Sequence, residues 1–278
     1  MKCKELMILK PMQKVQLELL HELDRVCKKN NLKYCLSSGT CLGALRHGGF
    51  IPWDDDIDVY MSWRDAEKLV KCQSDFQNKY FVQSYKTDVN FYSTSYRLCD
   101  SSTSCFLKGN EGIDMNHGIF IHIYIYYPYP DNKLKAQKII FYSFIYRFLI
   151  ARSISKRYGL LDSILNLFFR GKRRENIIKK IENEYHENGG KMYVATYFGR
   201  DIGLFKSIVY PIDWFDNPRY LKFENMDVPC PGDTERYCEL QYGKNFMELP
   251  SIEKRIPHHD FLYFSVDEPY TKFKGIYY

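Results

Sequence analysis

The segment at residues 53–61, with the sequence WDDDIDVYM, constrains the fold of this chain more than any other. It places four aspartates directly before apolar residues that are typical of a buried strand. A carboxylate without a partner is costly to bury. We therefore expect these aspartates to surround something positively charged.

Alternate side chains of an extended strand share a face and stand about 6.5–7 Å apart. On this basis Asp54, Asp56 and Asp58 would point one way, whereas Asp55 and Ile57 would point the other. Three carboxylates on one face repel one another unless a cation lies among them, and oxygen ligands suit Mg²⁺ or Mn²⁺. A solvated acidic loop is the alternative, and the aspartates alone do not decide between the two.

The turn upstream of the aspartates favours a metal that carries a phosphate. Ser38, Gly39 and Thr40 follow a predicted strand at 32–37 and precede a short predicted helix. Such a small-residue turn can present backbone N–H groups and a hydroxyl to a phosphate, and Arg46 would add a guanidinium group. A turn of this kind followed by Asp-x-Asp on a strand is typical of nucleotidyltransferase-fold enzymes.

The rest of the chain predicts an α+β fold with a mixed sheet, in one domain that spans residues 1–278. Residues 118–127 alternate, so that isoleucines share one face of a strand while Phe120, His122, Tyr124 and Tyr126 share the other, and two prolines end it. Further elements are expected from their spacing and composition: helices at 12–30 and 63–76, and strands at 79–85 and 91–99.

Residues 133–188 are predicted to form two or three basic helices inserted in this domain. The part at 133–180 holds 13 Lys and Arg but two acidic residues, in a chain whose net charge is +6. Two interpretations stay open: helices that pack on the core with a solvated basic face, or an amphipathic surface that lies on an anionic membrane. The acidic balance of the remaining residues argues against binding to nucleic acid.

The nine cysteines are scattered without a C-x-x-C pair, which predicts free thiols in a reducing cytosol. The N-terminus lacks the apolar core of a signal peptide, and the longest apolar run, residues 139–150, is too short to span a membrane. We therefore expect a cytoplasmic protein, with peripheral contact at the inner face of the membrane as an open alternative.

The whole string at residues 36–61, LSSGTCLGALRHGGFIPWDDDIDVYM, closely resembles the signature of the LicD family of phosphotransferases, which includes fukutin-related protein. Three further blocks resemble the same family in the same order: the helix ELLHELDRVCKKNNLKY, the strand GIFIHIYIYYPY and the C-terminal block LKFENMDVPCPGDTERYCELQYGKNFMELP. The resemblance is weak over residues 130–190.

The resemblance implies a fold similar to that of polymerase-β-like nucleotidyltransferases. It also implies a Mg²⁺- or Mn²⁺-dependent transfer of a phospho-alcohol, phosphocholine from CDP-choline being the first expectation. The acceptor would be a hydroxyl of a cell-surface glycan such as lipopolysaccharide or teichoic acid, and this glycan could be lipid-linked. Asp56 and Asp58 would bind metal, and Asp54 would bind metal or accept the hydroxyl proton. The donor phosphates would be held by Ser38, Gly39, Thr40 and Arg46.

The chain departs from the family at the second strand, which reads Ile121-His122-Ile123 where the family usually has Ile-Asp-Ile. The resemblance places His122 in the active site. A neutral imidazole can bind Mn²⁺ or act as a base, but it suits Mg²⁺ poorly. A histidine packed between Phe120 and Tyr124 is the alternative.

Two other functions stay open for the same residues. The fold could transfer a nucleotide to a small molecule with release of pyrophosphate, or the chain could be a catalytically impaired relative that binds a nucleotide or glycan. Arg97 could bind a phosphate or form a surface ion pair, and the sequence supports both equally. His258 and His259 are adjacent and so point two ways, which favours surface positions.

Overall fold

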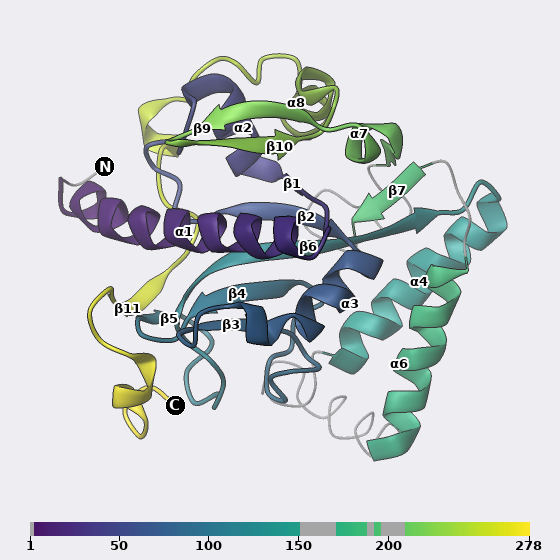
Figure 1. The fold of residues 1–278 in the computed structure, drawn as a ribbon, viewed down its shortest axis with the longest axis horizontal. Coiled ribbons are helices and arrows are strands. Elements are labelled where there is room, and N and C mark those ends of the chain that lie inside the picture. Colours follow the sequence, from purple (N-terminus) through teal and green to yellow (C-terminus); the bar gives the residue numbers. More distant parts are fainter. Residues whose placement is uncertain (1–2, 151–170, 188–191, 196–208) are drawn as a thin grey trace.

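The computed structural model describes residues 3–150, 171–187, 192–195 and 209–278. Its centre is a seven-stranded mixed sheet with the main order β1-β2-β6-β4-β3, to which β7 and β8 are added beside β6 (Figure 1). The strands are β1 (Tyr34–Leu36), β2 (Asp58–Ser62), β3 (Tyr80–Gln83), β4 (Tyr96–Asp100), β6 (Ile119–Tyr129), β7 (Met192–Ala195) and β8 (Tyr210–Pro211).

The mixed sheet expected from the sequence is confirmed. Strands β2 and β6 run parallel, with Asp58 opposite His122, and the other pairs in the sheet are antiparallel. The alternating segment forms β6, and both of its faces are buried: Ile121 is fully buried and Phe120 is 7% exposed. Pro128 does not end this strand, because it pairs with Tyr193 on β7 near the strand's last residue.

The helices surround this sheet, and two small antiparallel pairs of strands complete the described fold (Figure 1). The helices are α1 (Cys3–Lys29), α2 (Ser38–His47), α3 (Trp63–Lys71), α4 (Lys133–Ile150), α6 (Gly171–His186), α7 (Asp213–Asp216) and α8 (Thr234–Tyr242), with 3-10 turns η1 (Gln73–Asp75), η2 (Ile252–Lys254) and η3 (Tyr270–Phe273). The small pairs are β5 (Ser104–Leu107) with β11 (Phe261–Ser265), and β9 (Arg219–Phe223) with β10 (Met226–Cys230).

The prediction of a strand over residues 53–61 is wrong for residues 53–57 and confirmed from Asp58 onward. The residues before Asp58 form a turn and an extended connection, and β2 begins only at Asp58. The reason is that the backbone carbonyl groups of Asp54 and Asp55 accept hydrogen bonds from Gln13 and Gln16 of α1, at 2.9 and 2.8 Å. These carbonyl groups therefore bond to helix side chains rather than to a neighbouring strand.

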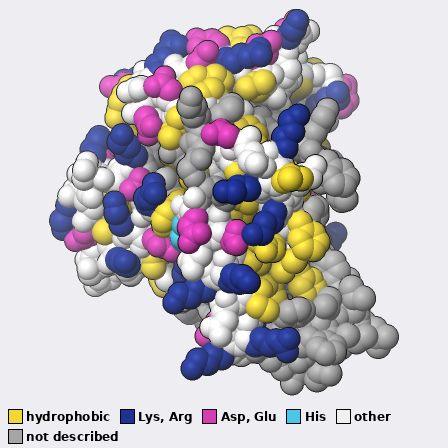
Figure 2. Space-filling view, turned by 90° about the vertical axis from the view of Figure 1, so that its right-hand side faces the viewer, with side chains coloured by type: hydrophobic (Ala, Val, Ile, Leu, Met, Phe, Trp, Pro, Cys, Tyr) yellow, Lys and Arg dark blue, Asp and Glu magenta, His cyan; other side chains and the backbone are white. Residues whose placement is uncertain are grey.

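The basic segment is helical where the structure describes it. Helices α4 and α6, which lie between β6 and β7 in the sequence, pack against each other. The helix expected over residues 151–170 lies outside the described residues. Leu134 and Phe141 of α4 are 77% and 62% exposed. Figure 2 faces the side of the molecule that carries α4 and α6 in Figure 1, and it shows hydrophobic side chains beside Lys and Arg.

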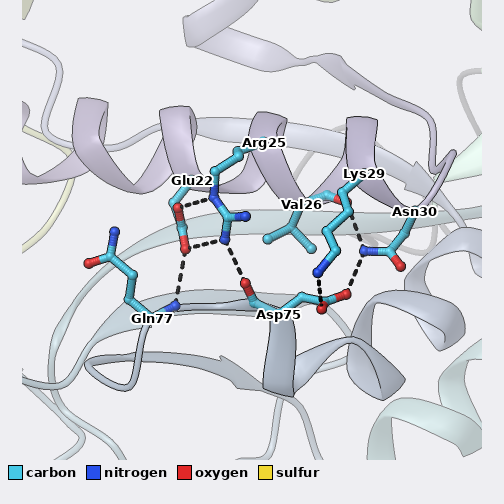
Figure 3. A network of polar contacts seen from close by, with 7 residues as sticks. All are labelled: Glu22, Arg25, Val26, Lys29, Asn30, Asp75 and Gln77. Atoms are coloured by element: carbon cyan, nitrogen blue, oxygen red, sulfur yellow. Dashed lines mark hydrogen bonds and ion pairs between the residues drawn. The ribbon is translucent and has the colours of Figure 1, made fainter.

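Helix α1 confirms the predicted amphipathic pattern, since Leu19, Leu23 and Val26 are fully buried. The polar side of its last turns is bound to the connection between α3 and β3 (Figure 3). There the Arg25 guanidinium donates to both Glu22 carboxylate oxygens, each at 2.8 Å, and to the Asp75 carbonyl group. This network fixes the position of α1 along the sheet, and with it Gln13 and Gln16 in the middle of the helix.

Two expectations about the whole chain can be compared with the described part. The eight cysteines whose side chains are described are free thiols, and seven of them are buried. Among the described helices, none is both long enough and apolar enough to cross a membrane.

Candidate active site

The N-terminus of α2 and the start of β2 are joined by two hydrogen bonds, and a third joins the residue before β2 to β6. The Asp58 N–H group donates to the Thr40 hydroxyl at 2.8 Å, and the Ser37 N–H group donates to the Asp58 carbonyl at 2.9 Å. On the other side of β2, the His122 N–H group donates to the Ile57 carbonyl at 2.8 Å. The aspartate turn is thereby held between the small-residue turn and β6.

The carboxylates of Asp54, Asp56 and Asp58 act on one another as a cluster. Burial, and then the Asp54 carboxylate, raise the pKa of Asp56 to about 7. Burial, and then Asp56 and Asp54, hold the pKa of Asp58 well above its ordinary value, although contacts with Ser38 and Tyr124 oppose this. Like charges raise a carboxyl pKa because each one disfavours ionisation of the next. A divalent cation would relieve this repulsion.

Two oxygen atoms in the cluster are buried without a hydrogen bond. Asp54 Oδ1 and Asp58 Oδ1 have no hydrogen-bond partner among the described residues, and their side chains are only 4% and 7% exposed. Such atoms are rare in native proteins because each loses its contacts with water. Their presence in a cluster of acids makes this cluster a candidate site for a cation.

Gly39 allows the turn to approach Asp54 closely. A Cβ atom at residue 39 would lie 2.7 Å from Asp54 Oδ2, which is shorter than any ordinary contact. The same carboxylate therefore lies at the N-terminus of α2, where the helix dipole favours negative charge. Ser38 precedes Gly39 with a positive φ of 46°, and its N–H group donates to the Tyr237 hydroxyl at 2.9 Å.

Two of the predicted phosphate contacts have structural partners. Thr40 is 3% exposed, and its hydroxyl accepts a hydrogen bond from the Asp58 backbone N–H group, so it positions the start of β2. The Arg46 guanidinium donates to the carbonyl groups of Phe246 and Glu248, at 2.8 and 3.1 Å, and so anchors the C-terminal block to α2. A role for either side chain at a donor phosphate stays a prediction.

His122 and Arg97 face each other in adjacent strands, since β4 and β6 pair Arg97 with His122. Burial, and then the positive charge of Arg97, hold the pKa of His122 well below its ordinary value, so that the ring is neutral near pH 7. The Arg97 guanidinium lies 3.8 Å from the centre of the Phe120 ring and forms no ion pair with a described residue. The surface ion pair considered for Arg97 is thus not found within the described part of the chain.

The side chains of His258 and His259 lie over the acidic turn, which the sequence did not predict. The Asp55 carboxylate accepts from the N–H groups of His258 and His259, at 3.2 and 2.8 Å. His258 Nδ1 lies 3.6 Å from Asp54 Oδ1, and this pairing raises the pKa of His258 to about 9. The surface position predicted for His259 is wrong, because 24% of its side chain is exposed and it contacts buried Asp55.

The sequence also did not predict that Gln13 and Gln16 hold the acidic turn through its backbone carbonyl groups. Gln16 is 3% exposed and stands beside the apolar stripe of α1, so a polar residue at a position expected to be buried was the available signal. No such signal existed for the histidine pair. Its placement depends on the pairing of β11 with β5, between strands more than 150 residues apart in the sequence.

Comparison with known proteins agrees with a nucleotidyltransferase type of domain. Residues 31–145, which hold the turn, the aspartates and β6, match the family model described as LicD/FKTN/FKRP, nucleotidyltransferase domain. The lipopolysaccharide cholinephosphotransferase LicD of Haemophilus influenzae is 26% identical over 266 residues, which cover 90% of this chain and 96% of that protein. An uncharacterized protein of Rickettsia prowazekii is 30% identical over 116 residues, 41% of this chain and 40% of its own length.

The resemblance to LicD proteins is thereby confirmed. Residues 31–145 belong to the LicD/FKTN/FKRP family by this match, and the similarity to a LicD protein extends over 90% of the chain.

Proposed function

We propose that this protein transfers a phospho-alcohol, with phosphocholine the first candidate, from a CDP-activated donor to a hydroxyl of a cell-surface glycan. The observation that carries the proposal is the pair of buried, unbonded carboxylate oxygens of Asp54 and Asp58 at the N-terminus of α2. The similarity to a lipopolysaccharide cholinephosphotransferase supports the choice of donor and acceptor. In this proposal residues 1–278 form one polymerase-β-like domain, with residues 133–188 inserted between β6 and β7.

The cluster fits a divalent cation, Mg²⁺ or Mn²⁺. Asp54, Asp56 and Asp58 offer hard oxygen ligands, and Asp54 Oδ1 and Asp58 Oδ1 form no hydrogen bond with a described residue. When bound, the cation would neutralise the charge that develops on the donor phosphates. Asp54, Asp56 and Asp58 are the residues that would hold it.

The transfer needs one proton acceptor and a set of phosphate contacts. The acceptor hydroxyl forms a P–O bond to the phosphorus that carries the alcohol, while the P–O bond to CMP breaks and CMP leaves with the electron pair. We assign the hydroxyl proton to the Asp54 carboxylate, whose Oδ1 lies 3.6 Å from His258 Nδ1. The N–H groups of Gly39 and Thr40 in the first turn of α2 have no partner within the helix and can bind donor phosphate.

The direct test is an assay for CMP. The protein is incubated with labelled CDP-choline, CDP-ribitol or CDP-glycerol, a glycan acceptor and Mg²⁺ or Mn²⁺. We expect metal-dependent release of CMP with at least one donor. We also expect a loss of about 10²-fold or more in Asp56→Asn, because electrostatic contributions of this size are usual for one group in such sites. Asp227→Asn changes an exposed aspartate on β10 and is the matched control.

The outcomes separate the alternatives. Pyrophosphate release from a nucleoside triphosphate, without CMP release from any CDP-alcohol, would replace the proposal with nucleotidyl transfer. Binding of CDP-choline without turnover under all conditions would show a catalytically impaired relative, and His122 would be the first residue to examine.

We also propose that α4 contacts an anionic membrane surface, where a lipid-linked acceptor would be presented. Leu134, Phe141, Ile145 and Phe148 recur at helical spacing on the side of α4 that is exposed or half-buried, and Lys133 and Lys135 are exposed at its start. Apolar side chains next to basic ones suit the boundary of an anionic bilayer. Figure 2 shows hydrophobic and basic side chains together on this side of the molecule.

Vesicle sedimentation tests this contact. We expect the protein to sediment with vesicles of phosphatidylglycerol and phosphatidylcholine at low salt, and a Leu134→Ser, Phe141→Ser variant to remain largely in solution. Val89→Ser, which changes an exposed apolar residue outside α4, is the control. Equal sedimentation of all three proteins, or none with the parent chain, would overturn the contact.

A further inference from the structure

We propose that Asp56, His122 and His259 form a nitrogen-rich cation site next to the three carboxylates, and that this site favours Mn²⁺ and similar transition-metal ions over Mg²⁺. The inference deepens the proposed function and rests on it for its biological meaning. The site differs from the carboxylate cluster because two of its three ligands are imidazoles and because one of them comes from the C-terminal segment.

The geometry brings three separate parts of the chain to one point. One ligand atom each of Asp56, His122 and His259 lies within 4.8 Å of the others, and His259 Nδ1 is 4.0 Å from Asp56 Oδ2. The two imidazole rings are nearly parallel, at 24°, with centres 6.0 Å apart. Ligands about 2.1 Å from a shared ion stand roughly 3 to 4 Å from one another, so small side-chain movements would complete the site.

His122 carries an unsatisfied atom. Its side chain is 9% exposed, and its buried Nδ1 has no hydrogen-bond partner among the described residues. Packing against Phe120 and Tyr124 accounts for the position of the ring but leaves this nitrogen without a contact. A buried polar atom without a partner is costly, and a bound cation near the ring would reduce this cost.

Asp55 holds the second imidazole in place. Its buried carboxylate accepts the N–H groups of His258 and His259, and its Oδ1 lies 3.3 Å from His259 Nδ1. Carboxylates commonly orient metal-binding histidines by accepting a hydrogen bond from the ring nitrogen that does not bind the ion, so Nε2 of His259 would be the nitrogen left for the cation. Asp55 is therefore a positioning residue.

The ligand types decide the preferred ion. Mg²⁺ takes oxygen ligands and water, whereas imidazole suits transition metals. A chain with a histidine at position 122 and a second histidine beside it should therefore bind Mn²⁺ through nitrogen. Asp56 belongs to both groups of ligands, so an ion here would lie next to one held by Asp54 and Asp58.

The experiment is pulsed electron paramagnetic resonance of Mn²⁺ bound to the full chain, with natural-abundance and ¹⁵N-histidine-labelled protein. We expect nitrogen couplings that change with the label. Calorimetry should show at least tenfold weaker Mn²⁺ binding in His259→Ala and in His122→Ala, with Mg²⁺ binding changed less than threefold. His21→Ala removes an exposed histidine of α1 and should bind both ions as the parent chain does.

The spectrum of the parent chain decides the question even if a variant fails to fold. Bound Mn²⁺ without any histidine nitrogen coupling would overturn the site, as would unchanged Mn²⁺ affinity in both variants. Failure of the proposed function is distinguishable from this result. Nitrogen couplings without CMP release from any donor would leave the cation site standing and remove the transferase proposal alone.

Discussion

Replacing Gly39 with alanine tests how closely α2 and the acidic turn must approach each other. The new Cβ atom would lie 2.7 Å from Asp54 Oδ2, while the next nearest atom, Asp54 Cγ, would be 3.6 Å away. An ordinary contact begins near 3.4 Å. The carboxylate must therefore turn or move away by roughly 0.7 Å, which is the difference between the 2.7 Å contact and the 3.4 Å of an ordinary one.

The expected effects of Gly39→Ala differ for stability and for metal binding. Overpacking costs about 1–3 kcal/mol, and the better helix propensity of alanine returns up to about 1 kcal/mol, so the net loss of stability is at most about 3 kcal/mol. Displacement of one ligand by this amount has a larger effect on function, since misplacing a reacting group by about 1 Å can cost 10²-fold. We expect Mn²⁺ affinity to fall by about tenfold or more.

Gly43→Ala is a matched control on the same helix. Its Cβ atom would meet the Gly49 carbonyl oxygen at 2.5 Å, a clash of similar size in which no carboxylate takes part. Calorimetric titration with Mn²⁺ and thermal unfolding should show that both variants are destabilised and that only Gly39→Ala binds Mn²⁺ weakly. Parent-like Mn²⁺ affinity in Gly39→Ala would refute the close packing of Asp54 as a requirement of the site.

Three further predictions concern the groups around this turn. His122→Asp should raise the ratio of Mg²⁺- to Mn²⁺-supported CMP release, and an unchanged ratio would favour a packing role for the histidine. The pKa of Asp56 is raised from 3.8 to about 7 in the folded chain, so the metal-free protein should lose stability as the pH rises between these values. Mn²⁺ should then raise the melting temperature more at pH 8 than at pH 5.5, and an equal rise would contradict this. Asp55→Asn can accept fewer N–H groups, so it should cost about 1–3 kcal/mol and expose the segment at His258 to protease.

Local patterns predicted the elements that carry the site. The stripe that includes Leu19 and Leu23 is the buried face of α1, and the alternation around His122 is β6. Gly48 ends α2 in the left-handed conformation, with φ of 67°, as expected for a glycine at a helix end. These features depend on the spacing of a few residues and on the freedom of glycine, which a sequence displays directly.

The parts that the sequence did not predict depend on distant contacts. Asp54 and Asp55 lie outside β2 because Gln13 and Gln16 of α1 bind their carbonyl groups, and nothing within the acidic segment indicates this. His259 reaches the turn through β11. A pair of adjacent histidines in a polar stretch carries no mark of that position, so its role became visible only with the three-dimensional structure.

The measurement that tests the central claim most directly is Mn²⁺ binding to the Asp56→Asn and Asp58→Asn variants by calorimetry with CDP-choline present. If the carboxylates hold a cation that carries the donor phosphates, both variants should bind Mn²⁺ at least tenfold more weakly than the parent chain, while Asp227→Asn should match it. Unchanged Mn²⁺ binding in both variants would contradict the metal site on which the proposed phosphotransfer depends.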